Sequence, residues 1–319
     1  MGPADEGDLQ RPATQEPASS GGVIASPWGA LRRLTDARVA LGRAGHSLPT
    51  AAHLALQADH AQARDAVHRP FDAAALAAQL QAQAPLAALQ RPADAGRPPL
   101  RLHSAARDRR EYLQRPDLGR QLDEASRALL RAETSADTAA GLTDVAADAP
   151  STDPWARPHL VVVLADGLSA LAAQRQAGPL LAALGASLAA DPQPWHLGPL
   201  VLVEQARVAV GDEIGQALGA ALVLVLIGER PGLSSPDSLG AYLTYAPRPG
   251  RTDAERNCVS NIRPAGLVPD RAAATLHWLL AAARQRGLTG VGLKDESPGP
   301  GQALASACVP GLAGVRDPG

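Results

Sequence analysis

Long runs of apolar residues in the second half of the chain predict buried strands. Residues 159–164 (HLVVVL), 200–210 and 222–227 (LVLVLI) are mostly apolar, which is typical of strands covered on both faces of a parallel sheet. Helical patterns follow the first two runs, and residues 270–286 predict a further helix. We also expect a short last strand at residues 291–293.

The alternation of strands and helices predicts an α/β domain at residues 156–300, with a mostly parallel, doubly wound sheet. The preceding residues 28–155 show helical patterns only, so we expect an all-α N-terminal region. Residues 134–158 are rich in Ala, Asp, Thr and Pro and predict a linker, which places the domain boundary near residue 155. Residues 1–27 and 301–319 are rich in Pro and Gly and predict tails, the first of them disordered.

Composition narrows the function classes. The net charge of −2 over 319 residues offers no general attraction to nucleic acid or to an anionic membrane. No apolar run approaches the ~20 residues of a membrane span, and the start of the chain lacks the segments of a secretory signal. The two cysteines, Cys258 and Cys308, are too few for a disulfide framework, so we expect a cytoplasmic protein.

The loop after the third buried run is the strongest candidate for a ligand site. Residues 228–232 (GERPG) cannot continue a regular element, and ligands of parallel α/β sheets bind where loops leave the carboxyl ends of strands. Glu229 is therefore placed as a fixed acceptor. Cys258 has polar neighbours, including Arg256 and Asn257, which favours a ligand contact over a buried small hydrophobe.

Other motifs favour structural roles. Residues 211–215 (GDEIG) lack the spacing of a dinucleotide loop, and two acidic residues there would repel a phosphate. Ser169 follows a strand, as a nucleophile would, but the glycine that ends such an elbow is missing, so we favour a helix cap. His53 and His60 lie two turns apart on a predicted helix, a spacing that favours a polar face over a metal site.

The densest distinctive string runs from residue 227 to 263 and contains Glu229 and the triplet Arg256-Asn257-Cys258. Further ordered strings lie at residues 37–45, 48–50, 59–68, 112–120, 164–170 and 207–215. Together they resemble the light chain (small subunit) of the ethanolamine ammonia-lyase family, over about residues 30–296.

This resemblance implies an adenosylcobalamin-dependent lyase that converts ethanolamine to acetaldehyde and ammonia. A separate heavy chain, a (β/α)₈ barrel, would hold the substrate and the reacting groups, and the light chain would cover part of the corrinoid. The resemblance implies cobalamin contacts at Val208, Glu229 and Cys258, with Arg207 as the alternative to Val208. It implies no catalytic residue or metal ligand in this chain, and it implies that residues 28–155 pack on the heavy chain in a hetero-oligomer.

The chain has no Asp-x-His-x-x-Gly string, which marks the cobalamin carriers in which a histidine binds cobalt. Its absence agrees with a cofactor that keeps its own benzimidazole on the metal. Two other functions stay open, namely a stand-alone α/β hydrolase that uses Ser169 with His196 or His277, and a binding subunit without the cofactor. Location in a bacterial microcompartment stays open beside the free cytoplasm.

Overall fold

The computed structural model describes residues 22–35, 37–90, 94, 96–139 and 159–297. Most of both predicted tails and most of the predicted linker lie outside these ranges, so the boundary expected near residue 155 stays a prediction. Contacts divide the chain into one unit that ends at Ala61 and another that begins at Gln62, a division that falls inside helix α1.

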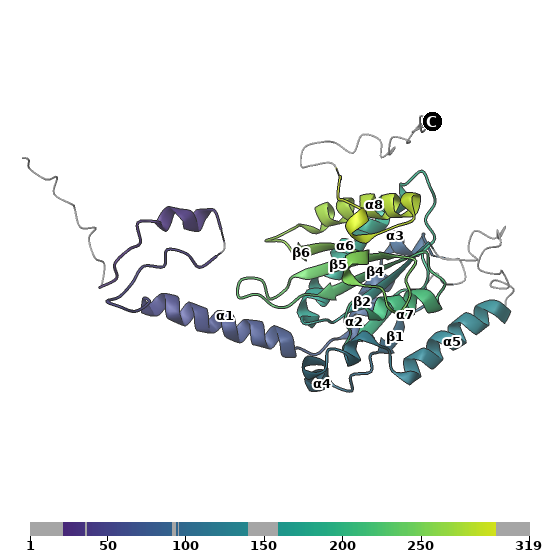
Figure 1. Cartoon of the computed structure of the whole chain (residues 1–319), viewed down its shortest axis with the longest axis horizontal. Helices are drawn as coiled ribbons and strands as arrows, with labels where there is room; N and C mark the ends of the chain where they lie inside the picture. The colour runs from purple at the N-terminus through teal and green to yellow at the C-terminus, as the bar shows by residue number, and fades with distance from the viewer. Residues whose placement is uncertain (1–21, 36, 91–93, 95, 140–158, 298–319) are drawn as a thin grey trace, which may run out of the picture. The chain divides into compact units, whose positions relative to one another are not determined.

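Six strands form one mixed sheet in the second unit, in the order β1-β3-β2-β4-β5-β6 (Figure 1). The first four strands in that order pair in parallel, whereas β5 is antiparallel to both β4 and β6. The strands are β1 (Leu100–His103), β2 (Leu160–Ala165), β3 (Val201–Glu204), β4 (Leu222–Gly228), β5 (Leu239–Tyr245) and β6 (Arg256–Ile262).

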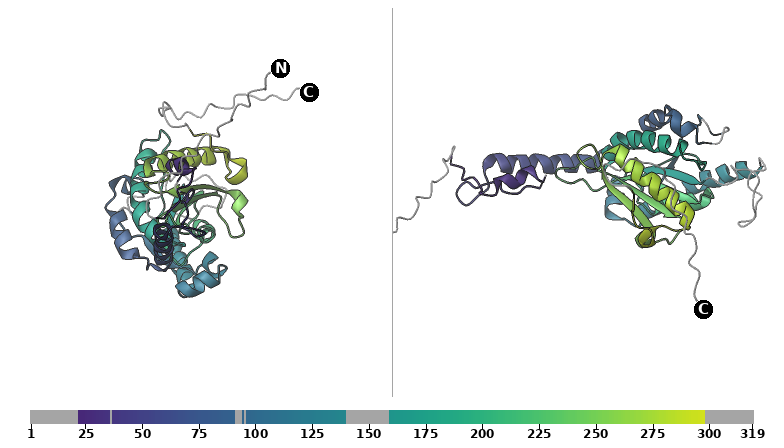
Figure 2. Two further views of the ribbon diagram at one scale, coloured as in Figure 1. Left: turned by 90° about the vertical axis from the view of Figure 1, so that its left-hand side faces the viewer. Right: turned by 90° about the horizontal axis from the view of Figure 1, so that it is seen from above.

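Helices pack on both faces of this sheet, with α2, α3, α6 and α8 on one face and α5 and α7 on the other, and Figure 2 shows α6 and α8 on the same face. The helices of the described residues are α1 (Thr50–His68), α2 (Ala73–Gln81), α3 (Ala84–Ala87), α4 (Arg109–Gln114), α5 (Glu124–Ala139), α6 (Ala170–Ala189), α7 (Val210–Ala217) and α8 (Pro269–Arg286). Short 3-10 turns lie at Gly29–Arg33, Leu118–Arg120, Asp253–Glu255 and Gly290–Gly292. None of the helices described is long and apolar enough to cross a bilayer.

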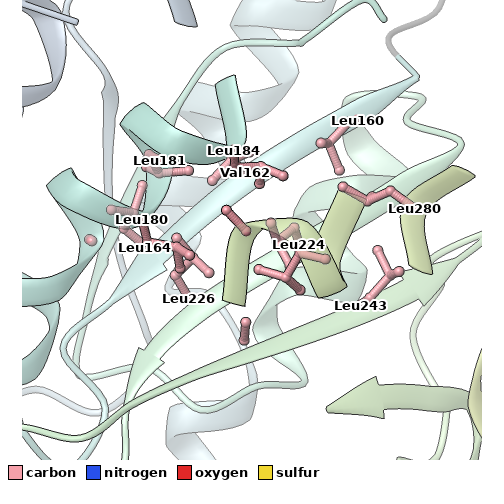
Figure 3. Close-up of a cluster of buried hydrophobic side chains, with 14 of the residues drawn as sticks. Leu160, Val162, Leu164, Leu180, Leu181, Leu184, Leu224, Leu226, Leu243 and Leu280 are labelled. Atoms are coloured by element: carbon pink, nitrogen blue, oxygen red, sulfur yellow. The ribbon is translucent and has the colours of Figure 1, made fainter. Parts of the chain in front are cut away.

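Alternation along β2 produces a separate apolar core on each face of the sheet. Leu160, Val162 and Leu164 face α6 and α8, where leucines of both helices surround them (Figure 3). The intervening Val161 and Val163 face α5 and α7. All six residues of β2 and all seven of β4 are buried, which explains why these two strands are the continuous apolar runs of the sequence.

Local signals end the helices where the sequence predicts. Ser169 caps α6, because its side chain accepts a hydrogen bond from the Ala172 amide. Pro269 begins α8, and Gly287, with a φ of 67°, ends it in the left-handed conformation. The helix expected over residues 270–286 is therefore confirmed apart from one residue at its start, and α1 confirms the helix that contains His53 and His60.

The α/β class is confirmed, but finer expectations for the sheet are not. The N-terminal region is not all-α, because β1 pairs in parallel with β3 at the sheet edge. A doubly wound parallel sheet is not confirmed either, because β5 and β6 make antiparallel pairs. The expected strand at residues 291–293 was wrong, since Gly290–Gly292 is a 3-10 turn whose two glycines disfavour a strand.

Candidate functional site

A groove of about 400 Å³ lies at the carboxyl ends of β2, β3 and β4. Helix α6, which follows β2, packs on one face of the sheet, and α7, which follows the neighbouring β3, packs on the other. The loops between these strands and helices therefore diverge and leave a crevice, as parallel α/β sheets do at their ligand sites. The groove is lined by Tyr112, Gly167, Leu168, Arg207, Val208, Ile227, Gly228, Glu229, Arg230 and Tyr242.

Glu229 is half-buried and held by Ser238, just before β5, and by Asn261 of β6. Its amide donates to the Ser238 carbonyl at 3.0 Å, and its Oε2 accepts from the Ser238 hydroxyl at 2.5 Å and from the Asn261 amide at 3.3 Å. No hydrogen-bond donor within the described ranges contacts Oε1. The carboxylate is thus fixed through one oxygen, while Oε1 lies close to Gly240, where a Cβ would be 3.0 Å away.

Two glycines allow the floor of the groove to form. The Leu168 amide donates to the Gly228 carbonyl at 2.9 Å, which joins the loops after β2 and β4. A Cβ on Gly228 would lie 2.0 Å from the Ser169 carbonyl oxygen, and one on Gly167 would lie 2.3 Å from the Gly228 oxygen. Gly167 also has a φ of 55°, which favours glycine. Close backbone approach, rather than chain flexibility, explains the glycines here.

Val208 follows β3 and lines the groove opposite Glu229, and a segment from the N-terminal half holds its loop in place. The Arg207 amide donates to the Gly119 carbonyl at 2.7 Å, and the buried Tyr112 hydroxyl donates to the Ala206 carbonyl at 3.1 Å. The Arg207 guanidinium lies over the Tyr112 ring, 4.4 Å from its centroid. Sequence reasoning missed Tyr112 as a site residue, although it belongs to one of the distinctive strings, residues 112–120.

Cys258 lies on strand β6, because residues 256–262 pair with β5. It sits opposite Tyr242, whose side chain lines the groove, and its own side chain is exposed. Partial desolvation raises the pKa of the thiol, and the nearby Glu229 raises it further, while a hydrogen bond with Tyr242 lowers it. A thiol that stays protonated fits a ligand contact better than a nucleophile.

A second groove of about 760 Å³ shares Arg207 and Val208 with the first. Beneath it, Arg256 of β6 and Asp212 of α7 form a two-pronged ion pair with both N–O distances at 2.7 Å. Each side chain is only 2% exposed. The groove is lined by Arg120, Gln121, Arg127, Arg207, Val208, Ala209, Asp212, Glu213, Pro249, Gly250, Arg251, Thr252, Asp253 and Arg256.

Asp166, at the end of β2, is a buried carboxyl behind the first groove. Its Oδ1 accepts from the Ala206 amide at 3.2 Å, and its Oδ2 lies 3.3 Å from the Arg109 guanidinium. Burial raises the pKa of Asp166 to about 6, and Arg109 opposes that rise. Arg109 also donates to the Gly167 carbonyl at 2.7 Å, so this pair links α4 to the loops after β2 and β3.

The residues of a hydrolase do not come together. Ser169 is fully buried, and its hydroxyl donates to the Pro236 carbonyl at 2.7 Å. The His196 backbone pairs with residues at the opposite end of β2, about 20 Å away for a six-residue strand. His277 binds Asp191 at 2.7 Å, and Trp195, next to His196, donates to the same carboxylate. The structure therefore offers Ser169 neither histidine as a base.

Comparison with known proteins is consistent with this geometry. A sequence model of the family described as "Ethanolamine ammonia-lyase light chain" matches residues 25–294. The chain is similar to proteins named "Ethanolamine ammonia-lyase small subunit" in several bacteria. It is 55% identical to that of Ralstonia nicotianae (87% of this chain, 92% of the relative) and 54% identical to that of Azotobacter vinelandii (85% and 89%).

Arg256→Ala tests the buried ion pair. Loss of one partner leaves Asp212 charged and buried, which costs about 3–5 kcal/mol of unfolding free energy, measured by urea denaturation. Arg115→Ala, which breaks the exposed pair with Asp117, serves as the control and should cost far less, because solvent screens an exposed pair. If both variants lost the same unfolding free energy, the buried pair would stabilise the fold no more than the exposed one.

Asp166→Asn tests the raised pKa of Asp166. Because folding raises this pKa from 3.8 to about 6, the stabilising contribution of the protonated group is complete below pH 3.8 and is lost as the pH rises through 6. The unfolding free energy of the wild type, minus that of the variant, is therefore expected to fall between pH 4 and 7, by at most about 3 kcal/mol.

The same urea measurements on Asp117→Asn provide the control for that trend. Arg115 lowers the pKa of Asp117 from its ordinary value of 3.8, so the contribution of this pair is complete above about pH 4 and the difference for these two proteins should stay constant from pH 4 to 7. A pH-independent difference for Asp166→Asn would show that the Asp166 carboxyl does not titrate in this range.

Proposed function

The chain belongs to the ethanolamine ammonia-lyase light-chain family, and on this premise we propose that it helps to bind adenosylcobalamin at an interface with a catalytic heavy chain. The complex would convert ethanolamine to acetaldehyde and ammonia. The observation that carries the proposal is the groove at the carboxyl edge of the sheet, which brings Val208 and Glu229 together and has Tyr242, the strand partner of Cys258, in its wall.

The residues of the groove fit the periphery of a corrinoid. The corrin ring carries amide side chains, which both donate and accept hydrogen bonds. Glu229 presents a carboxylate as an acceptor, and Arg230 at the rim presents a donor. Val208 and Ile227 supply apolar contact. When bound, the cofactor supplies radical chemistry from its cobalt–carbon bond, while the protein positions it and limits access of water.

The open form of this groove supports a second protein as its opposite wall. Both grooves are open to the surface and are lined by strand ends, loops and helices of this chain. A site that holds a reactive radical must exclude water, which this chain does not do by itself. We therefore place the heavy chain over the groove, with the corrinoid between the two proteins.

Exposed apolar side chains in the first unit suggest further contact with the heavy chain. Trp28 is 67% exposed and Leu34 is 82% exposed, although large apolar groups of this kind are usually buried. The set also contains Ile24, Leu31, Leu48 and Leu54. The proposal that residues 28–155 pack on the heavy chain explains why several such groups occur within about 30 residues of sequence.

Within this proposal the chain contributes no catalytic acid, base or nucleophile. Ser169 is a buried cap, and the Cys258 thiol stays protonated. The complex would act in the cytoplasm, with enclosure in a bacterial microcompartment as the finer hypothesis. The alternative of a binding subunit without cofactor predicts that no corrinoid absorption band is retained after the two chains and cobalamin are mixed and sized.

An assay of the separate chains tests the division of labour. The purified light chain with adenosylcobalamin and ethanolamine should release no ammonia, and the mixture with heavy chain should release it continuously. Ammonia release by the light chain alone would overturn the assignment of the chemistry to the heavy chain. Retention of cobalamin by the mixture but not by the light chain would support the shared site.

Glu229→Ala tests the cofactor contact. Loss of a fixed acceptor should raise the Kd of cobalamin for the mixed complex by about tenfold, with a smaller change in kcat at saturating cofactor. Glu124→Ala, at an exposed position of α5, is the matched control and should change neither value. An unchanged Kd in Glu229→Ala would remove Glu229 from the site.

A further inference from the structure

The arginines of the second groove fall into two groups. Three of them are neutralised by carboxylates: Arg127 pairs with Glu213, Arg251 with Glu255 and Arg256 with Asp212. The other two, Arg120 and Arg207, form no salt bridge within the described part of the chain. The groove therefore holds two guanidinium groups without a carboxylate partner, while the exposed Asp253, 3.6 Å from the Arg256 Nε, adds one negative charge to its lining.

Arg207 is positioned by packing instead of by an acid. Its guanidinium stacks on Tyr112, and Nη2 donates to the Tyr112 carbonyl at 3.4 Å. Its Nε is sealed from solvent without a hydrogen-bond partner among the residues described. A ligand in the groove cannot reach this sealed nitrogen, so it would bind the rest of the guanidinium, which lines the groove.

Arg120 adds its charge to the same groove. The backbone beside it is tied to Arg207, because Gly119 accepts a hydrogen bond from the Arg207 amide at 2.7 Å. A Cβ on Gly119 would lie 3.0 Å from the Arg207 Cγ, so the two segments pack directly together. Together with Glu255, which pairs with Arg251, the lining holds five arginines against four acidic residues, in a chain whose net charge is −2. The excess positive charge is thus local and not a property of the whole surface.

We propose that Arg207, with Arg120 beside it, binds a phosphodiester, namely the one in the nucleotide loop of cobalamin. The inference rests on the proposed function, because it assumes that a corrinoid occupies the adjoining groove. The nucleotide loop carries a single anionic phosphodiester, whereas the peripheral side chains of the corrin are neutral amides. Arginine suits this group because its planar fork matches two phosphate oxygens. Val208 and Arg207 line both grooves, so corrin and phosphodiester would bind on one continuous surface.

Binding to the complete complex of light and heavy chains tests the phosphodiester site without use of activity. Equilibrium dialysis with absorption detection would measure the Kd of cyanocobalamin and of cobinamide, which lacks the nucleotide loop and its phosphate. Arg207→Gln should raise the Kd of cyanocobalamin about tenfold or more and leave that of cobinamide unchanged. Arg207→Lys should raise the Kd of cyanocobalamin by a smaller factor, because lysine keeps the charge but not the planar fork of arginine.

Two further variants control the measurement. Arg120→Gln changes an exposed side chain and should weaken cyanocobalamin binding to a smaller extent, again without effect on cobinamide. Arg101→Gln changes an exposed arginine outside both grooves and should alter neither Kd. Sizing of each variant complex would show that the chains are still folded and assembled.

Several outcomes would overturn the inference. Equal loss of cyanocobalamin and cobinamide affinity in Arg207→Gln would show that Arg207 shapes the groove and binds no phosphate. Failure of this variant to assemble with the heavy chain would assign the arginines to an acidic segment of that chain. Inorganic phosphate that binds as tightly as cyanocobalamin would assign the site to free phosphate. By contrast, a wild-type complex that binds neither corrinoid would contradict the proposed function itself.

Discussion

The buried ion pair between Arg256 and Asp212 is the constraint on which the site geometry depends. Asp212 lies in the first turn of α7, just after the loop that carries Val208, and Arg256 lies two residues before Cys258 on β6. The pair therefore joins two segments 44 residues apart in sequence. Removal of two charges from water is costly, and such pairs often contribute little net stability. We infer that this pair is kept because it sets the position of α7 relative to the edge of the sheet.

Close backbone contacts set the other side of the site in the same way. The loops after β2 and β4 touch at Gly167 and Gly228, and neither position has room for a Cβ. Glu229 follows directly, so its place is determined by how near the two strands end to each other. Asp166 and Arg109 connect this contact to the loop after β3. Close backbone contacts and buried polar groups thus hold the ends of β2, β3 and β4. The side chains that line the groove project from these fixed strand ends.

The N-terminal half is part of the site and not only an attachment to a partner. β1 extends the sheet, and the segment around Tyr112 supports the loop of Arg207 and Val208. A substitution near Tyr112 would therefore alter the groove through the loop after β3. Together these parts still form an open surface, with both grooves exposed at the surface of this chain. This agrees with the heavy chain as the opposite wall in the proposed complex.

The position of each strand in the sheet decides whether the sequence pattern could identify it. β2 and β4 are central and buried on both faces, so their apolar runs identified them, and with them the loop that places Glu229. Short edge strand β1 and half-exposed β6 contain mixed residues, and their identity as strands depends on partners far away in sequence. The family followed from long ordered strings. By contrast, the tertiary structure alone decided that Tyr112 supports the site, that Cys258 lies on a strand, and which groove arginines lack a carboxylate. Each of these depends on contacts between distant segments, which no local pattern of residues encodes.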